Sequence, residues 1–148
     1  DFNAPLYENN DVSPQYKWSV DSTVKAWLNS NVSPSKLVIG IPFYGYIYRG
    51  VNNLNNGLYQ TFTTSSSSTY SNIVKNYLSL SDYKLYFHEQ SKVPWLFNGS
   101  TFISYENEVS IAYKAQYIKN NNLGGAMIWE LSQDYNGTLL NTIYENLK

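Results

Sequence analysis

The chain has 148 residues, a formal net charge of −1 and no cysteine, and charged residues make up only 14% of it. This length suits one domain with a sizeable core, whereas the charge excludes the basic surface that nucleic-acid binding requires. The sequence has no apolar run of about 20 residues that could span a membrane. It has no thiol for disulfides or metal ligands. Its single histidine, His88, argues against a histidine metal site or a Ser-His-Asp triad.

The first third of the chain predicts a helix followed by a buried strand. Residues 1–18 contain two prolines and no clean period, so they predict an extended loop. Apolar residues at helical spacing predict a helix over residues 20–31, with Ser19 or Asp21 as its N-terminal cap. The apolar residues of KLVIGIPFYG, residues 36–45, are consecutive, as in a strand covered on both faces. A helix followed by such a strand is typical of parallel α/β proteins.

The middle of the chain, residues 46–104, predicts an α+β insertion within this α/β frame. The turn signal Asn-Gly at 56–57 lies between short aromatic stretches and predicts antiparallel strands. The serine run at 65–68 predicts a flexible loop, and residues 71–80 predict a short helix. Two or three further strands, with a turn at 98–99, are predicted in YKLYFHEQ and VPWLFNGSTFISY.

The α/β frame resumes at Tyr105. NEVSIAYKAQYIKNNNL, residues 107–123, has apolar residues at helical spacing and predicts a helix that ends at 120–122. LGGAMIWEL, residues 123–131, predicts a second buried strand of the parallel type, and residues 138–146 predict a final helix.

Two motifs in this order, KLVIGIPFYG and LGGAMIWELSQD, with KVPWLFNGSTFISY between them, resemble the C-terminal part of chitinases of glycoside hydrolase family 18. They are similar to the seventh and eighth strands of that family's barrel. The resemblance implies an α/β fold with an α+β insertion, the C-terminal part of a (β/α)8 TIM barrel that is incomplete in this chain. It divides the chain into a barrel segment (1–45), a chitin-insertion domain (46–104) and a second barrel segment (105–148).

The sequence departs from the family pattern in its catalytic motif. The family's DxxDxDxE run is absent, since none of the eleven Asp and Glu residues reproduces its spacing, and the MxYD run is missing as a whole. A complete barrel needs about 250 residues, far more than are present. The chain also opens on Asp1 with neither methionine nor a signal-peptide pattern, so we interpret it as part of a longer chain that was cut.

The resemblance implies hydrolysis of chitin or related N-acetylglucosamine β-1,4-polymers by substrate assistance, an exception to the two-carboxylate scheme. In that mechanism one Glu protonates the leaving oxygen while the acetamido carbonyl of the substrate attacks the anomeric carbon, without a metal or organic cofactor. Both family carboxylates belong to the missing signature, so we expect no catalytic residue, no metal and no cofactor in this chain. The resemblance further implies an extracellular or secreted protein.

Candidate binding residues lie where the two predicted barrel strands end, because parallel barrels carry their chemistry at the carboxyl ends of strands. Tyr44 ends the first strand, and Trp129 and Glu130 end the second. By resemblance, Trp129 is the floor on which the sugar beside the broken bond stacks, and Tyr44 is the family's cleft tyrosine. A buried core residue is the alternative for Trp129. For Glu130, substrate contact and a loop-capping role remain equally open.

Four further positions carry expectations, three of them from the resemblance. Tyr46 stands where the family has Arg, and a phenol does not replace a guanidinium, so Arg49 is left open as a substitute. Glu89 resembles an acid of the insertion domain that touches the sugar chain. Trp95 stands where the family usually has Tyr, and packing within the small sheet is its favoured alternative. For Asp134, a loop cap is favoured over substrate contact.

Aromatic residues make up 17% of the chain, and their rings can stack on sugars without any charge, although packing is the alternative for each tyrosine. Three functions therefore fit the sequence. The first is a fragment of a chitin-acting hydrolase that is inactive alone, and the second is a stand-alone carbohydrate-binding module. The third is a structural partner that completes a barrel. Expected partners are chitin or N-acetylglucosamine oligosaccharides, together with the missing N-terminal barrel segment or a second copy joined through exposed sheet edges.

Overall fold

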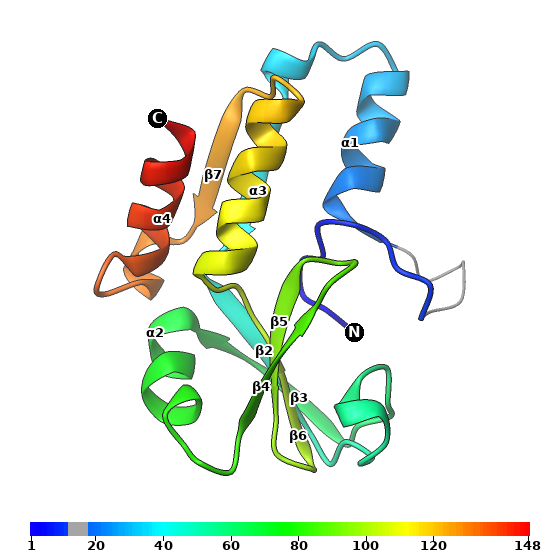
Figure 1. Cartoon of the computed structure of the whole chain (residues 1–148), viewed down its shortest axis with the longest axis vertical. Coiled ribbons are helices and arrows are strands. Elements are labelled where there is room, and N and C mark those ends of the chain that lie inside the picture. The colour runs from blue at the N-terminus through cyan, green and yellow to red at the C-terminus, as the bar shows by residue number, and fades with distance from the viewer. Residues whose placement is uncertain (12–17) are drawn as a thin grey trace.

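The chain forms two sheets that meet at a short turn. The structure is a computed structural model and describes residues 1–11 and 18–148, so the predicted loop over 1–18 lies partly outside the described residues. Strand β1 (Val38–Pro42) belongs to a two-stranded parallel sheet, and β2 (Tyr44–Arg49) belongs to a five-stranded antiparallel sheet. Figure 1 shows the parallel sheet with α1, α3 and α4 at one end of the molecule and the antiparallel sheet with α2 at the other.

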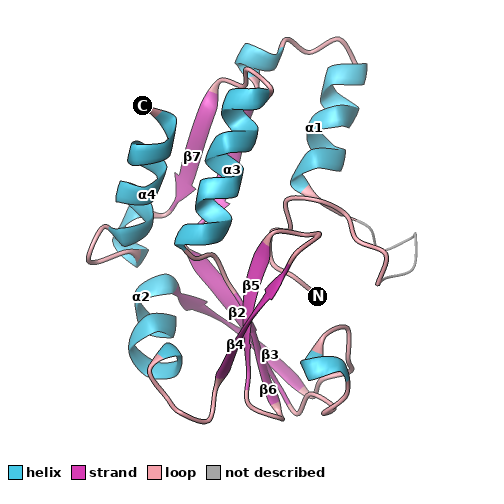
Figure 2. Cartoon of the chain, in the orientation of Figure 1, coloured by secondary structure: helices cyan, strands magenta, loops and turns pink. Residues whose placement is uncertain are grey.

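The remaining elements follow in chain order around these sheets (Figure 2). The helices are α1 (Val20–Asn29), α2 (Tyr70–Ile73), which continues as a π-helix over Val74–Leu78, α3 (Glu108–Asn120) and α4 (Thr138–Leu147). The other strands are β3 (Thr64–Thr69), β4 (Lys84–His88), β5 (Val93–Phe97), β6 (Thr101–Ser104) and β7 (Gly125–Trp129). Among the described residues, no helix is long and apolar enough to cross a membrane.

The predicted helix–strand repeats are confirmed. Ser19 caps α1 through a capping box with Ser22, and Asn107 caps α3 in the same way. Strands β1 and β7 pair in parallel, with Pro42 opposite Trp129. The structure therefore contains the α/β frame with an α+β insertion that the sequence predicts.

One face of the parallel sheet is covered and the other is open. Ile39 and Ile41 are buried in a core that they share with residues of α1, α3 and α4. On the other face Val38 is 52% exposed and Met127 47% exposed. The prediction that these strands are covered on both faces is therefore wrong for the described chain, because its helices pack on one face only.

The turn between the two sheets lies at Phe43, one residue before Tyr44. Phe43 is fully buried, its N–H donates to the Trp129 carbonyl at 2.8 Å, and its carbonyl accepts from the Tyr70 N–H at 2.8 Å. The prediction of one strand over residues 36–45 is thus wrong at its end, since β1 stops at Pro42 and Tyr44 already belongs to β2. These bonds fix the carboxyl end of β7 against the start of β2.

The five-stranded sheet has the order β3-β2-β6-β5-β4, and β3 is one of its edges. The serine run at 65–68 lies within β3 and pairs with β2, so the prediction of a flexible loop is wrong. Pairing with β2 satisfies the backbone groups on one side of β3, and the exposed edge tolerates hydroxyl side chains. Of the antiparallel strands predicted on either side of residues 56–57, the first is confirmed as β2. The second is wrong, because residues 55–57 form a 3-10 turn and residues 58–63 join no strand.

Two hydrophobic cores hold these layers together. The first joins the parallel sheet to its helices and to one face of the antiparallel sheet, where Ile47 and Ile103 are buried with Ile73 of α2. The second lies on the opposite face of the antiparallel sheet, under the N-terminal segment and the 51–59 loop. Its members are Phe2, Val51, Leu58, Val93, Trp95, Phe97 and Phe102.

Candidate functional site

A groove of about 470 Å³ lies at the carboxyl end of β7, where the two sheets meet. Its described lining contains aromatic rings, hydroxyls and carboxamides but no charged side chain. The lining residues are Tyr44, Tyr46, Ser67, Ser68, Thr69, Asn72, Trp129 and Gln133. Such a surface can stack on a flat apolar face and exchange hydrogen bonds with neutral polar groups.

Trp129 forms one wall of this groove. Its side chain is 61% exposed, on the same open face of the parallel sheet as Met127. The strand ends at Trp129, as predicted, and the peptide bond to Glu130 is cis. An exposed indole at the groove excludes the alternative of a buried core tryptophan in the described chain.

Tyr44 and Tyr46 form a second wall and come from the same face of β2. Their rings lie 5.9 Å apart between centroids, edge to face. The carbonyl of Tyr44 accepts a hydrogen bond from Asn3 Nδ2 at 3.0 Å, and the Asn3 N–H donates to Ser104 Oγ at 2.8 Å. Gly45 between them permits this placement, because a Cβ there would lie 2.4 Å from the Ser104 carbonyl oxygen.

The third wall comes from the end of β3 and the start of α2. Thr69 caps α2, with its hydroxyl accepting from the Asn72 N–H at 3.2 Å. Asn72 Nδ2 lies 3.4 Å from Ser68 Oγ. The serine run thus supplies the groove with hydroxyl groups. The spacing of apolar and polar residues in the sequence did not indicate this role.

Gln133 was not identified from the sequence, because it follows the predicted strand in a polar turn. The hydroxyl of Ser71 donates to the Gln133 carbonyl at 3.0 Å and accepts from the Tyr135 N–H at 2.9 Å. Among the described residues, the buried Gln133 Oε1 has no hydrogen-bond partner. One serine of α2 therefore holds the loop after β7 in place beside the groove.

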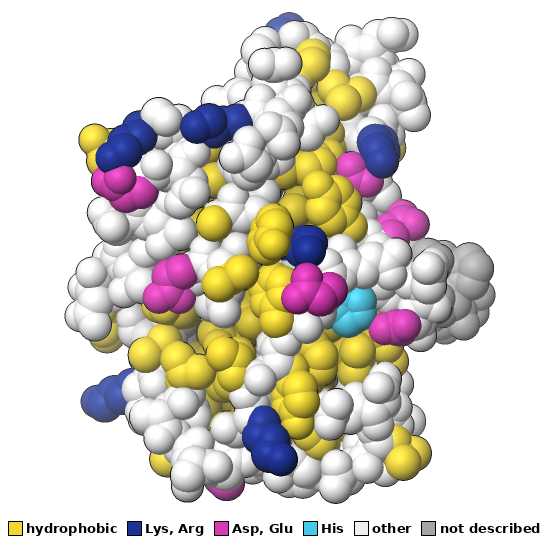
Figure 3. Space-filling model, in the orientation of Figure 1, with side chains coloured by type: hydrophobic (Ala, Val, Ile, Leu, Met, Phe, Trp, Pro, Cys, Tyr) yellow, Lys and Arg dark blue, Asp and Glu magenta, His cyan; other side chains and the backbone are white. Residues whose placement is uncertain are grey.

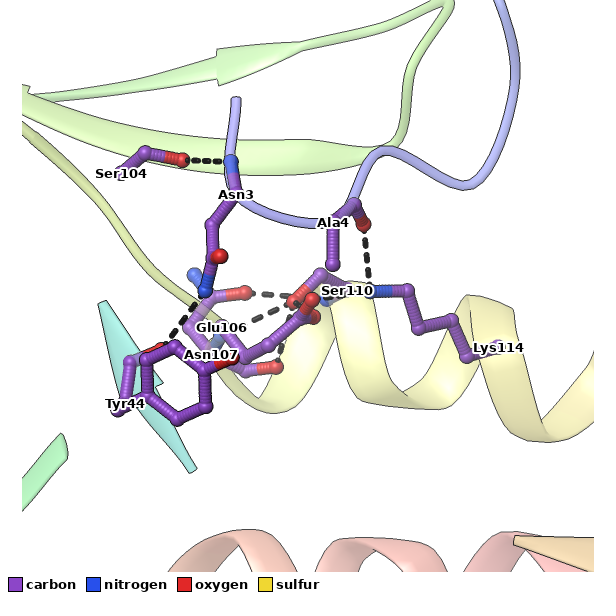
Figure 4. Close-up of polar contacts among 8 residues, drawn as sticks. All are labelled: Asn3, Ala4, Tyr44, Ser104, Glu106, Asn107, Ser110 and Lys114. Atoms are coloured by element: carbon purple, nitrogen blue, oxygen red, sulfur yellow. Dashed lines mark hydrogen bonds and ion pairs between the residues drawn. The ribbon is translucent and has the colours of Figure 1, made fainter. Parts of the chain in front are cut away.

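A buried ion pair holds the N-terminal segment that contacts Tyr44 of the groove (Figure 4). Lys114 of α3 is fully buried and pairs with Glu106, which is 2% exposed. Lys114 Nζ also donates to the Ala4 carbonyl at 2.7 Å, and Ser110 Oγ donates to Glu106 Oε2 at 2.6 Å. The pair anchors the N-terminal segment, and the adjacent Asn3 in turn binds Tyr44.

The ion pair was also missed from the sequence, although a signal exists. Lys114 lies on the buried stripe of α3, three residues after Ile111 and four before Ile118. A lysine at such a position must find a partner or leave a charge unpaired in the core. This argument predicts a buried acid nearby, which is Glu106.

The two acids after Trp129 have different surroundings. Glu130 is exposed, accepts from Ser132 Oγ at 2.6 Å and does not line the groove. Asp134 is buried and accepts from three backbone N–H groups at the start of α4, at 3.0, 2.8 and 3.0 Å. Asp134 thus caps the start of α4, in agreement with the loop-cap role that the sequence favoured over substrate contact.

Glu89 and Trp95 do not line the groove. The side chain of Glu89 is 82% exposed and pairs with Lys92 at 3.1 Å in the turn between β4 and β5. Trp95 is only 6% exposed, lies in the second core and donates from Nε1 to the Asn56 carbonyl at 3.1 Å. The structure therefore places Trp95 in a core rather than on a binding surface.

Arg49 and His88 form hydrogen bonds outside the groove. Arg49 donates to Ser66 Oγ at 3.0 Å, at the end of β2 away from Tyr44, so it does not take the place of the family's arginine beside Tyr46. His88 Nε2 lies 3.0 Å from an Asp11 carboxylate oxygen, and its Nδ1 accepts from the Ser91 N–H. Figure 3 shows the histidine near acidic side chains on a face where cations are scattered rather than clustered.

Two further observations concern the protonation of a buried tyrosine and the possibility of metal binding. Burial raises the pKa of the Tyr70 phenol, and the carboxylates of Glu108 and Asp134 raise it further, so this core residue next to Thr69 is neutral at neutral pH. Within the described parts of the chain, no three His, Cys, Asp or Glu side chains lie together in a way that could hold a metal ion.

Comparison with known proteins identifies the family of this chain. The family profile described as "Glycosyl hydrolases family 18" matches residues 1–134. Chitinase A1 of Niallia circulans is 39% identical over 140 residues, which cover 88% of this chain and 20% of that protein. The chain therefore spans about a fifth of the length of this relative.

Solved structures share the fold. A family 18 N-acetylglucosaminidase from Paenibacillus barengoltzii superposes with a TM-score of 0.93 at 34% identity, covering 99% of this chain and 43% of that one. A chitinase-like agglutinin from Robinia pseudoacacia superposes with a TM-score of 0.81 at 28% identity, covering 97% and 40%. The neighbours are TIM-barrel proteins, and the described chain corresponds to a part of such a barrel rather than to a closed one.

Proposed function

Because the chain belongs to glycoside hydrolase family 18, we propose that it carries substrate-binding subsites of a hydrolase that acts on chitin or related N-acetylglucosamine β-1,4-polymers. The observation that carries this proposal is the exposed indole of Trp129 beside Tyr44, in a groove whose described lining carries no charged side chain. Trp129 would stack on a sugar ring, and Tyr44 and Tyr46 would contact the same sugar or its neighbour.

The chemistry of the groove suits a neutral sugar. A hexose presents an apolar face of C–H groups that an indole covers well, and its hydroxyl and acetamido groups need donors and acceptors. Ser67, Thr69 and Asn72 provide such groups across from the rings. Glu130 and Glu89 lie outside this groove, and their contact with a longer sugar chain remains part of the proposal.

The proposal places the catalytic acid on polypeptide outside this chain, since the DxxDxDxE run is absent from the sequence. We expect no metal or cofactor to be required, because the family's substrate-assisted mechanism uses neither. A polymer as large as chitin does not enter cells, so we also propose an extracellular or secreted site of action.

Isolated residues 1–148 should show no turnover of N-acetylglucosamine oligomers, because the DxxDxDxE run is absent from the sequence and the described lining of the groove contains no carboxylate that could protonate the leaving oxygen. The measurement is mass-spectrometric analysis of chitohexaose after prolonged incubation with purified, mass-verified chain. A complete family 18 chitinase serves as the positive control. Hydrolysis above the buffer blank that follows the chain through purification would contradict the proposal.

The open surfaces of the parallel sheet point to a missing neighbour. An apolar groove of about 370 Å³ lies between α1 and β1, lined by residues that include Trp18, Trp27 and Val38. These side chains are 77%, 55% and 52% exposed. We propose that the preceding barrel segment covers this groove and the open face in the complete protein, as unpaired strand edges and apolar patches usually require a partner.

Without that segment, the chain should associate with itself as its concentration rises. Sedimentation velocity over a concentration series should show a growing dimer or larger species, together with binding of a hydrophobic dye. Val38→Lys combined with Met127→Lys should shift the chain toward monomer, because inward-pointing charges oppose pairing through the open face. A wild-type chain that stays monomeric with low dye binding would contradict the proposed open surfaces.

A non-catalytic carbohydrate-binding protein is the second candidate function. The similarity to a chitinase-like agglutinin over 97% of this chain favours it, since the same barrel region occurs in that protein. Both candidates predict sugar binding without turnover by the isolated chain. An open reading frame with DxxDxDxE upstream of Asp1 would favour the hydrolase, and a frame that lacks the terminal Glu would favour the binding protein or a structural barrel partner.

A further inference from the structure

We propose that Ser71, which lies outside the groove, is a positioning residue that fixes the two sides of the groove relative to each other. Its hydroxyl joins α2 of the insertion to the loop after β7, and this loop carries Gln133 into the groove. The inference rests on the proposed function, because the effect of Ser71 is read in the binding of the same sugar. It goes further in giving the insertion a part in placing the tryptophan side of the groove.

The two sides of the groove belong to parts of the chain that are distant in sequence. One side comes from β7 and the loop after it, and the other comes from the end of β3 and the start of α2. At the turn between the sheets, the Phe43 N–H donates to the Trp129 carbonyl and the Phe43 carbonyl accepts from the Tyr70 N–H, both at 2.8 Å. These bonds join the two sides where β7 ends, but the loop beyond Trp129 needs an attachment of its own.

The loop after β7 exposes most of its large side chains. Leu131 is 60% exposed and Tyr135 85% exposed, and Glu130 is exposed as well. Asp134 is buried, but its carboxylate binds the start of α4 rather than α2. Segments with few buried contacts open easily, so packing alone does not hold this loop firmly against α2.

Ser71 supplies the attachment with one hydroxyl that is used twice. Its Oγ donates to the Gln133 carbonyl at 3.0 Å and accepts from the Tyr135 N–H at 2.9 Å, across 62 and 64 residues of sequence. A serine hydroxyl can do both at once because it has one donor and two acceptor lone pairs. In the described chain, no other side chain of α2 bonds to residues 130–137.

Ser71 acts through the loop, because it is not among the residues that line the groove. Its neighbour Asn72 does line the groove, and its N–H donates to the Thr69 hydroxyl at 3.2 Å. The same helical turn thus presents one residue to the groove and another to the loop. Without the Ser71 hydroxyl, the loop that carries Gln133 must be ordered when the sugar stacks on Trp129, and this ordering costs affinity.

The binding test removes the hydroxyl in the full chain, at concentrations where sedimentation shows monomer. In calorimetric titrations, Ser71→Ala should bind chitotriose about fivefold more weakly than wild type. Ser71→Thr keeps the hydroxyl and should restore the affinity. Ser71→Cys keeps the size but is a weak donor and acceptor, so its affinity should fall between those of wild type and Ser71→Ala. Ser79→Ala, at an exposed serine just after the π-helical segment of α2, is the matched control and should bind like wild type.

Hydrogen exchange followed by nuclear magnetic resonance reports on the loop in the absence of sugar. The Tyr135 amide should exchange roughly tenfold faster in Ser71→Ala, because its acceptor is gone, and should return to the wild-type rate in Ser71→Thr. The amide of Ile111, buried in α3, is the internal control and should keep its rate. A general loss of stability would instead speed both amides together.

A Ser71→Ala chain that binds chitotriose like wild type would overturn the positioning role, whatever the exchange rate of Tyr135. Failure of Ser71→Thr to restore the affinity would also overturn it, because the hydroxyl would then not be the group that matters. If Trp129→Ala loses chitotriose binding while Ser71→Ala keeps it, the proposed groove stands and only the role of Ser71 is wrong. Absence of any binding by the wild-type chain would overturn the proposed groove together with this inference.

Discussion

Replacement of Trp129 by alanine is expected to lower the affinity of the chain for chitotriose by roughly 30-fold, which corresponds to about 2 kcal/mol. The indole is the largest exposed apolar surface of the groove, and stacking against a sugar would bury it. Since the side chain is 61% exposed, its removal should leave the free energy of unfolding nearly unchanged. Isothermal titration calorimetry and urea unfolding measure the two quantities separately.

A matched control exists in the same chain. Trp27 of α1 is 55% exposed and lies outside the groove, so Trp27→Ala should bind chitotriose like wild type. Trp129→Phe should lose less affinity than Trp129→Ala, because a smaller ring still stacks. Equal affinities of wild type and Trp129→Ala would remove Trp129 from the binding surface.

Replacement of Lys114 by methionine is expected to lower the free energy of unfolding by about 3–5 kcal/mol. The change leaves the Glu106 carboxylate buried without its cation and removes the donor to the Ala4 carbonyl. Losses of this size are a large share of the stability of a small domain. Urea unfolding followed by circular dichroism gives the value.

The controls separate the buried charge from the loss of a lysine. Lys119 lies on the exposed side of α3, and Lys119→Met should change stability by no more than about 0.5 kcal/mol. The double variant Glu106→Leu/Lys114→Met should recover much of the loss, since apolar residues can replace a buried pair. A Lys114→Met protein as stable as wild type would show that the pair is not needed to hold the N-terminal segment.

The local signals of the sequence predicted the parallel frame well. Consecutive apolar residues in 36–45 and 123–131 identified β1 and β7, although only one face of the two strands is covered in the described chain. Helical spacing located α1, α3 and α4 to within a few residues, and Ser19 was one of the two predicted caps of α1. The end of β7 at Trp129 followed from the motif, and Trp129 is 61% exposed there.

Features that depend on partners distant in sequence were not predictable in the same way. The serine run became β3 because β2 offers a pairing edge, which composition alone does not reveal. The break at Phe43 depends on bonds to Trp129 and Tyr70. Gln133 entered the groove through the loop that Ser71 holds, and a polar turn carries no periodic signal for such a contact.

The most direct test observes the Trp129 indole itself during a chitotriose titration of the isotopically labelled chain by nuclear magnetic resonance. The account predicts a saturable shift of the Trp129 indole N–H, together with the amides of Tyr44 and Ser67, while the Trp27 indole stays unchanged. A Trp129 resonance that does not move at saturating sugar, or shifts confined to residues outside the groove, would contradict it.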